Sequence, residues 1–276
     1  MMRSLWTAAS GMRAQQVNVD TIANNVANIN TIGYKSQQAS FKSLLYQNLQ
    51  STSTNNAGEN KPVAAEVGLG SRVAAITSTF TQGNLTHVEN PFSVALEGDG
   101  FFQIRTQSGE LQYTRDGSFE ISPVANGNML CTSDGNPVLD VYGKAIVLPS
   151  NRVATDLVVN QDGTLAFPDA SGNPAVLTDA NGRPVKFGIY QFNNPAGLSK
   201  EGSNNYSVTV ASGAAVAENG NAAVKQTKTH QYYTEASNVD VANEMVNLIV
   251  AQRAYEMNSK AIQASDEMMQ QANALR

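Results

Sequence analysis

The carboxyl-terminal stretch constrains the fold most, because bulky apolar side chains return there every seven positions. The bulky column consists of Leu248, Tyr255, Ile262 and Met269. A second column of small or polar residues, three positions later in each repeat, consists of Ala251, Asn258, Ser265 and Ala272. No Gly or Pro interrupts residues 237–276. This heptad repeat predicts one long helix with a narrow apolar seam, and such a helix requires a helical partner.

The amino-terminal stretch carries the same repeat and is the expected partner. Its bulky column consists of Leu5, Met12, Val19 and Val26. The column three positions later consists of Ala8, Gln15, Ile22 and Ile29. We therefore predict a helix over residues 4–29, with Gly33 as its left-handed cap, that pairs with the last helix as a coiled-coil stem. Two amphipathic helices packed on a globular core are the alternative.

An asparagine cluster lies near the end of the first predicted helix. Asn24, Asn25 and Asn28 fall within five residues, although asparagine is a mediocre helix former because its amide competes for the backbone. Amides in a tight seam can fix register through hydrogen bonds. We expect these residues to fix the register of a tight helical seam; a solvent-facing turn is the alternative.

The region between the two predicted helices changes to an apolar period of two. This pattern predicts strands at residues 73–76, 92–96, 101–104, 145–148, 157–159, 186–192 and 206–210. Asp-Gly and Asn-Gly dipeptides recur between these runs and suit tight hairpin turns. The predicted fold class is α+β, with a mostly antiparallel all-β domain inserted between two terminal helices.

Three domains follow from this order. Residues 1–35 and 236–276 form a discontinuous helical assembly domain, residues 36–71 form a connecting segment, and residues 72–235 form the β-rich domain. Residues 34–50 suit either a helix or an extended hairpin arm, and the polar residues 51–61 suit a loop or mobile segment. Burial of about a dozen apolar side chains falls short of the entropy cost of ordering both helices, so we expect them to be loose in a lone subunit.

Composition excludes several classes of function. The net charge of −5 argues against nucleic-acid binding, and the low content of charged residues, 15%, lets copies meet without strong repulsion. Cys131 is the only cysteine, so an intrachain disulfide is excluded. We find neither an apolar run long enough for a membrane helix nor a cleavable secretory signal over residues 1–16.

Candidates for chemistry are few. His87 and His230 lack ligand spacing for zinc, and Cys131 suits a structural thiol. Glu97 and Asp99 lie two positions apart, and such a carboxylate pair could perform glycosidic acid–base chemistry, with a turn as the alternative. The sequence therefore predicts no catalytic, cofactor-binding or metal-binding residue and no enzyme.

Residues 23–35 (ANNVANINTIGYK) and residues 252–260 (QRAYEMNSK) are two of several motifs that resemble signatures of the bacterial flagellar basal-body rod and hook family of axial proteins. Residues 23–35 resemble its amino-terminal signature, and residues 235–240 and 252–260 resemble its carboxyl-terminal signature. Residues 82–85, 98–102 and 113–117 resemble landmarks of its β-domain. The chain length and residues 41–47 are most similar to the distal-rod branch. Ser93, Asn243 and residues 211–228 depart from the family pattern.

The resemblance implies a structural subunit that assembles helically into a rigid hollow rod, transmits torque to the hook and lets exported subunits pass. It implies that residues 34–70 stiffen the rod. The implied partners are copies of itself, proximal-rod and hook subunits, ring bushing proteins and the flagellar type III export apparatus. The implied location is the rod across the periplasm, reached without a cleaved signal peptide. Alternatives are a proximal-rod or hook-related subunit, and a secreted peptidoglycan hydrolase using Glu97 and Asp99.

The predicted subunit interface combines the bulky columns, the asparagine cluster and their neighbours. Its members are Leu5, Met12, Val19, Ile22, Asn24, Asn25, Val26, Asn28, Ile29, Leu248, Tyr255, Asn258, Ile262 and Met269.

Overall fold

The structure is a computed structural model that describes residues 2–50, 65–124, 127–150, 152–168, 174–179, 182–220 and 224–274. The loop predicted at residues 51–61 lies outside these ranges. The chain divides into two compact units. The helical unit comprises Met1–Ala27, Gln37–Ser78 and Asp240–Arg276, and the β unit comprises Asn28–Ser36 and Thr79–Val239.

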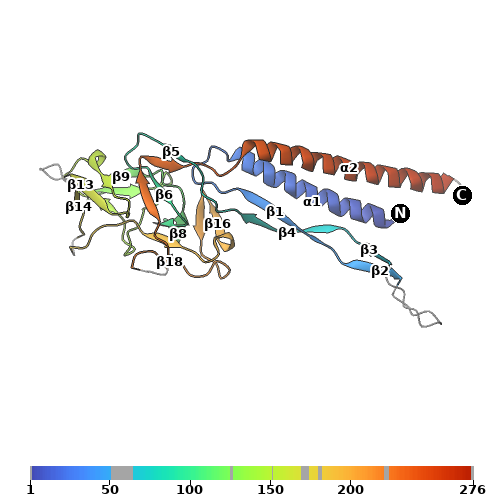
Figure 1. The fold of residues 1–276 in the computed structure, drawn as a ribbon, viewed down its shortest axis with the longest axis horizontal. Helices are drawn as coiled ribbons and strands as arrows, with labels where there is room; N and C mark the ends of the chain where they lie inside the picture. Colours follow the sequence, from blue (N-terminus) through green and yellow to red (C-terminus); the bar gives the residue numbers. More distant parts are fainter. Residues whose placement is uncertain are drawn as a thin grey trace. The chain divides into compact units, whose positions relative to one another are not determined.

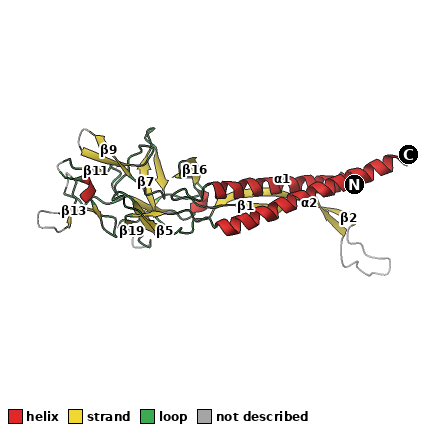
Figure 2. Ribbon diagram, turned by 90° about the horizontal axis from the view of Figure 1, so that it is seen from above, coloured by secondary structure: helices red, strands yellow, loops and turns green. Residues whose placement is uncertain are grey.

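The predicted α+β class with a helix near each end of the chain is confirmed. Helix α1 spans Met2–Ala27 and helix α2 spans Val241–Ala274, with mostly antiparallel strands between them in the sequence. Figures 1 and 2 both show α1 and α2 side by side, with their directions opposed. Neither helix has the combination of length and apolar character that crossing a membrane would need.

Helix α2 begins at Val241 because Asp240 caps its first turn. The Asp240 carboxylate accepts hydrogen bonds from the backbone N–H groups of Ala242 at 2.9 Å and Asn243 at 3.4 Å. An aspartate in this position satisfies donors that the first turn of a helix leaves unpaired, and it also complements the helix dipole.

The segment after α1 is extended rather than helical. Strand β1 (Gln37–Ser43) pairs with β4 (Ser71–Ser78), and β2 (Tyr46–Gln50) pairs with β3 (Ala65–Gly68), both antiparallel. Strands β1 and β4 lie against α1. The hairpin-arm alternative for residues 34–50 is therefore correct, and the described part of this arm belongs to the helical unit.

The β unit is built from short strands. Its strands are β5 (Leu85–His87), β6 (Val94–Glu97), β7 (Phe101–Arg105), β8 (Leu111–Thr114), β9 (Glu120–Val124), β10 (Gly127–Cys131), β11 (Val147–Leu148), β12 (Val158–Val159), β13 (Leu165–Pro168), β14 (Pro174–Val176), β15 (Ile189–Gln191), β16 (Ser199–Gly202), β17 (Asn205–Ser207), β18 (Val216–Ala217), β19 (Lys228–Gln231) and β20 (Tyr233–Glu235). Short 3-10 turns occupy Ala154–Asp156 and Pro195–Gly197.

The largest sheet of the described part has the strand order β16-β17-β8-β7-β15-β18, and every pairing in it is antiparallel. Strand β7 lies within this sheet, where Phe101 faces one apolar cluster and Phe102 faces the other. Alternate residues of a strand point to opposite faces, so this single strand contributes to both clusters. Phe101, Phe102 and Phe119 are 0% exposed.

Candidate assembly interface

The two helices meet through contacts that repeat every seven residues. Ser4 Oγ lies 3.3 Å from Ser265 Oγ, and Asn25 Nδ2 donates to Glu244 Oε1 at 3.0 Å. Between these layers, an ideal Cβ placed on Gly11 would lie 3.0 Å from Asn258 Nδ2. From one pair to the next, α1 advances by seven or fourteen residues while α2 goes back by the same number. This register places Asn18 opposite Ala251. The part of α2 after Glu267 extends beyond the start of α1.

The intrachain seam is made of small and polar side chains. Ala8, Ala251 and Ser265 are buried in it, and Gly11 has no side chain at all. Small residues let helix backbones approach closely, and the glycine leaves room for the Asn258 amide. The small column found in the sequence of α2 is therefore the one that faces α1.

The bulky columns lie beside this seam and are only partly covered. We call these residues the ridge: Leu5, Met12, Val19 and Val26 of α1, with Leu248, Tyr255, Ile262 and Met269 of α2. Tyr255 is 44% exposed and the other seven are half-buried. Val19 and Tyr255 line one recess of about 420 Å³. The described residues thus leave the ridge as a partly uncovered apolar surface.

The remaining predicted interface residues have different environments. Ile22 is 6% exposed and Asn25 is 1% exposed. The Asn25 amide donates to Gln37 O and accepts from Gln37 N, both at 2.8 Å, in addition to its bond with Glu244. Asn25 therefore ties α1, β1 and α2 together within one chain.

The last three residues of the predicted set are more accessible. Asn24 is exposed, whereas Asn28 and Ile29 are half-buried and belong to the β unit. The Asn28 side-chain oxygen accepts a hydrogen bond from Thr31 Oγ1 at 3.1 Å, which helps to turn the chain after α1.

Helix α2 carries a second apolar surface that the sequence analysis did not single out. We call it the outer stripe: Val246, Val250, Met257, Ala261, Ala264 and Met268. Its four large members are between 50% and 65% exposed, and both alanines are exposed. Each residue of an α-helix advances about 100° around the axis, so Met257 lies about 160° from the ridge residue Tyr255. The outer stripe and the ridge therefore occupy nearly opposite sides of α2.

The β unit contains a buried ionic cluster, which we call the clasp: Lys35, Arg115 and Glu235. Their side chains are at most 1% exposed. Lys35 Nζ lies 2.5 Å from Glu235 Oε1, and Arg115 Nη1 lies 3.4 Å from Glu235 Oε2. Burial lowers the pKa of Lys35, while the Glu235 charge opposes this shift. The single Glu235 carboxylate is therefore shared by two buried cations, whose side chains are almost fully removed from solvent.

The clasp gathers segments that are distant in the sequence. Glu235 Oε1 accepts a hydrogen bond from the Gly83 N–H, and Glu235 O accepts one from the Gly33 N–H, both at 2.8 Å. An added Cβ on Gly83 would lie 2.0 Å from Ala236 O, so only glycine allows this approach. Asn238 continues the network, because it accepts from Ser36 N at 2.7 Å and donates to Thr79 O at 2.8 Å.

The carboxylate pair considered for catalysis has the wrong electrostatics for a glycosidase acid. Glu97 Oε2 lies 2.7 Å from His230 Nε2, and this hydrogen bond lowers the pKa of Glu97. A general acid requires a raised pKa. Asp99 is exposed in the bend between β6 and β7. Burial raises the pKa of the Cys131 thiol, which makes it a poor nucleophile.

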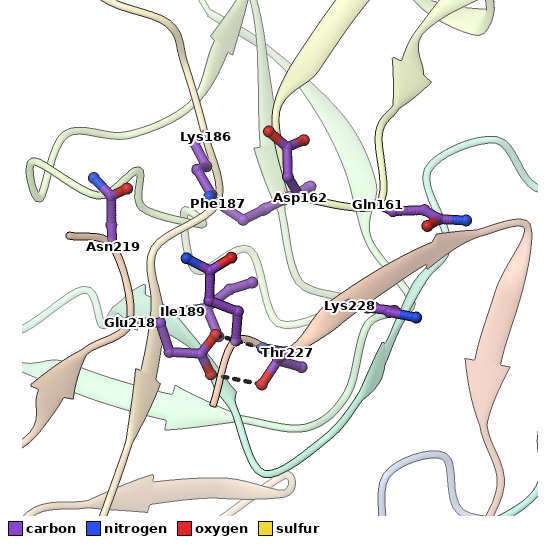
Figure 3. A pocket seen from close by; sticks show the side chains of 10 residues that line it. Gln161, Asp162, Lys186, Phe187, Ile189, Glu218, Asn219, Thr227 and Lys228 are labelled. Atoms are coloured by element: carbon purple, nitrogen blue, oxygen red, sulfur yellow. Dashed lines mark hydrogen bonds between the residues drawn. The ribbon is translucent and has the colours of Figure 1, made fainter. Parts of the chain in front are cut away.

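A recess of about 240 Å³ in the β unit is lined in part by residues that hydrogen-bond to one another (Figure 3). The Glu218 carboxylate accepts hydrogen bonds from Thr227 N at 2.8 Å and Thr227 Oγ1 at 2.5 Å. Gln191 Nε2 donates to Glu218 Oε1 at 2.7 Å. Both carboxylate oxygens are therefore engaged in holding the chain around Thr227. Within the described ranges, no three His, Cys, Asp or Glu side chains converge as metal ligands would.

Family models match both ends and the middle of the chain. A model described as "Flagella basal body rod protein" matches residues 5–35, and "Flagellar basal body rod FlgEFG protein C-terminal" matches residues 230–275. A third, "Flagellar hook protein FlgE/F/G D1 domain", matches residues 95–167. The clasp residues Lys35 and Glu235 thus lie within the two terminal matches.

Full-length relatives agree with these matches. The chain is 43% identical to the flagellar basal-body rod protein FlgG of Borreliella burgdorferi, with 100% of this chain and 99% of the relative covered. It is 38% identical to FlgG of Caulobacter vibrioides, with full coverage of both chains, and 35% identical to FlgG of Bacillus subtilis, with 98% of each covered.

The two terminal helices with partly exposed apolar surfaces and the antiparallel β unit are the features by which the chain resembles its relatives, which are proteins of the flagellar basal-body rod. The chain belongs to the flagellar basal-body rod protein family. It is a structural subunit of the rod and not an enzyme, and its family assembles into the rod with other flagellar components.

Proposed function

We propose that this chain is a distal-rod-type subunit that stacks helically into a hollow, rigid shaft, carries torque to the hook and leaves a passage for exported subunits. The observation that carries the proposal is the contrast between a closed β core and a ridge that remains partly uncovered along both helices. Apolar surface of this extent on a soluble chain marks a contact site for another protein.

The terminal helices, within residues 1–35 and 236–276, form the assembly domain in this proposal. The contact layers seven residues apart on α1 and α2 support a coiled-coil arrangement of the pair. The bulky ridge residues face neighbouring subunits, because the small column already occupies the intrachain seam. The connecting segment, residues 36–71, stiffens the shaft, and the β-rich domain, residues 72–235, forms the outer body.

The proposed partners follow from this role. They are further copies of the chain, proximal-rod and hook subunits, the ring bushing proteins around the rod and the type III export apparatus. The proposed location is the part of the rod that crosses the periplasm, reached without cleavage of a signal peptide.

The test is to introduce a charge into the ridge. Leu248→Asp and Ile262→Asp each place a carboxylate at a half-buried ridge position and should abolish rod assembly and motility, because an unpaired buried charge is costly. Val210→Asp in the β unit is the matched control, since Val210 is fully exposed at 104%. Motile cells carrying either ridge variant would contradict the proposal.

Assembly should also change the order of the helices. The purified chain should gain ellipticity at 222 nm as its concentration rises into the range where polymers form, because neighbours cover the ridge. The β unit provides the internal reference, since its near-ultraviolet signal should stay constant. Full helicity in the dilute monomer, without any concentration dependence, would show that stacking is not needed to order the ends.

A further inference from the structure

We propose that the outer stripe of α2 docks along the ridge of a second copy of this chain. This inference rests on the proposed function and names the surface that covers the ridge. The stripe and the ridge are both surfaces of the helical unit, and both are apolar and accessible along most of α2. The docked arrangement places one helix of the second copy over the groove between α1 and α2 of the first.

The stripe and the ridge share one axial repeat. Val250, Met257 and Ala264 are seven residues apart, as are Ala261 and Met268. The ridge columns of α1 and α2 repeat at the same interval. Seven residues of helix rise about 10.5 Å, so side chains of the stripe stay in step with spaces between ridge side chains along the whole contact.

A rod extends by repeating one contact, which requires two different surfaces on each subunit. Stripe and ridge lie on nearly opposite sides of α2, so a stripe-to-ridge contact leaves one free stripe at one end of an assembly and one free ridge at the other. Such a heterologous contact extends without limit when its rotation does not close a ring. A stripe-to-stripe contact would instead be isologous and would close as a dimer.

The competing apolar recess of the helical unit matches the stripe less well than the ridge does. A recess of about 490 Å³ lies between α1 and the hairpin arm, lined by Trp6 and Val17 of α1 and by Val73 of β4, among others. Part of its wall is formed by strands, which rise about 3.3 Å per residue and present side chains with a period of two. That wall does not share the helical repeat of the stripe, so the ridge is the better match.

The test is disulfide cross-linking between two differently substituted chains assembled together. One chain carries Met257→Cys on the stripe, and the other carries Leu5→Cys, Met12→Cys or Val19→Cys on the ridge. The three ridge positions lie in successive repeats. One of them should therefore lie near Met257 of the other copy, whichever whole number of repeats separates the two copies along the helix axis. The native Cys131 is 5% exposed and stays in place. Oxidation of assembled material should give mixed dimers with at least one ridge position.

Two controls define the comparison. Gln263→Cys replaces an exposed residue of α2 outside the stripe, and it should give several-fold less mixed dimer than Met257→Cys. Val17→Cys samples the competing recess. Dimers of Met257→Cys with itself, or mixed dimers with Val17→Cys in place of the ridge, would overturn the inference.

A charge substitution gives an independent measurement. Val250→Asp places a charge in the apolar contact and should raise the concentration needed for polymerisation by about tenfold or more. A tenfold change requires only a modest loss of contact free energy. Val210→Asp should leave it unchanged. Polymers that form normally with Val250→Asp would refute the stripe contact while leaving the proposed function intact. Failure of the unsubstituted chain to polymerise at all would remove the proposed function itself, and this inference with it.

Discussion

The helical unit and the β unit differ in how far they bury their apolar side chains. In the β unit, Phe102, Ile104 and Leu139 are 0% exposed, so the apolar core closes within one chain. In α2, Val250 and Met257 remain more than 60% exposed, and the buried contacts with α1 are made by alanine, serine and asparagine. The first unit is stabilised by its own core, whereas α2 in the second unit leaves most of its larger apolar side chains exposed.

Charged residues differ in the same way. The β unit encloses Lys35, Arg115 and Glu235 completely, and their partners come from segments up to 200 residues apart. The ion pair that the structure describes on α2, between Arg253 and Glu256, is exposed at the surface. A buried cluster fixes how remote segments meet, and a surface pair contributes little to stability.

The largest effect should come from removing a core aromatic ring. Phe102→Ala should lower the free energy of unfolding of the β unit by about 3–5 kcal/mol, because it leaves a cavity among Phe119, Phe187 and their neighbours. Met257→Ala should change the stability of the dispersed chain by less than about 0.5 kcal/mol. Chemical denaturation monitored separately for strands and helices measures both. Equal losses for the two variants would show that α2 depends on its exposed apolar side chains as much as the β unit depends on its core.

The clasp should give the next largest effect. Glu235→Gln leaves Lys35 and Arg115 as buried charges without a counter-ion and should cost about 3–5 kcal/mol in the β unit. Asp179→Asn alters the exposed pair with Lys144 and should cost no more than about 1 kcal/mol. Urea unfolding curves at neutral pH compare the two. A loss for Glu235→Gln as small as that for Asp179→Asn would mean that the clasp is not a stabilising centre.

Alkaline pH should destabilise the β unit through Tyr206. Burial raises the pKa of Tyr206 to about 12 from 10.0. The folded chain therefore keeps this proton after the unfolded chain has lost it, so the stabilisation is complete below pH 10.0 and disappears as the pH approaches 12. The expected loss is about 2–3 kcal/mol. Tyr206→Phe should flatten this part of the stability profile, and an unchanged slope would contradict the assignment.

The smallest effect should come from the helix seam. Ala251→Leu inserts a large side chain where Ala251 is 1% exposed, and it should destabilise the helix pair by roughly 1–2 kcal/mol. Ala261→Leu makes the same change at an exposed position of the same helix and should be nearly neutral in the dispersed chain. Helix melting followed by circular dichroism separates them. Identical melting would show that the small column does not form the seam.

The helices and the strands with apolar runs were predictable from the sequence. The first helix was expected at residues 4–29 and spans Met2–Ala27. The run at residues 101–104 predicted β7, Phe101–Arg105, because buried strands keep their apolar pattern. Strand β1, with the sequence QQASFKS, remained ambiguous because most of its residues are exposed and it carries no clear alternation. Its extended form depends on pairing with β4, which a local pattern does not encode.

The candidate site was only partly predictable. Periodicity identified the bulky and small columns, but it does not say which column faces the partner within the same chain. That choice depends on the register set by Ser4, Gly11 and Asn25 against α2. The clasp was missed because Lys35 and Glu235 are 200 residues apart, and buried ion pairs leave no periodic trace. The signal in the sequence was the position of both residues inside the polar terminal signatures.

The unequal lengths of the two helices have a mechanical consequence. With Ser4 opposite Ser265, the last turns of α2 extend beyond the first residues of α1 (Figure 1). This end of α2 carries Met268, which is 50% exposed, and the half-buried Met269. If copies stack along the helix direction, the extended end of α2 in one copy would overlap the next copy and be supported by it. A polymer built in this way is polar, because its two ends differ.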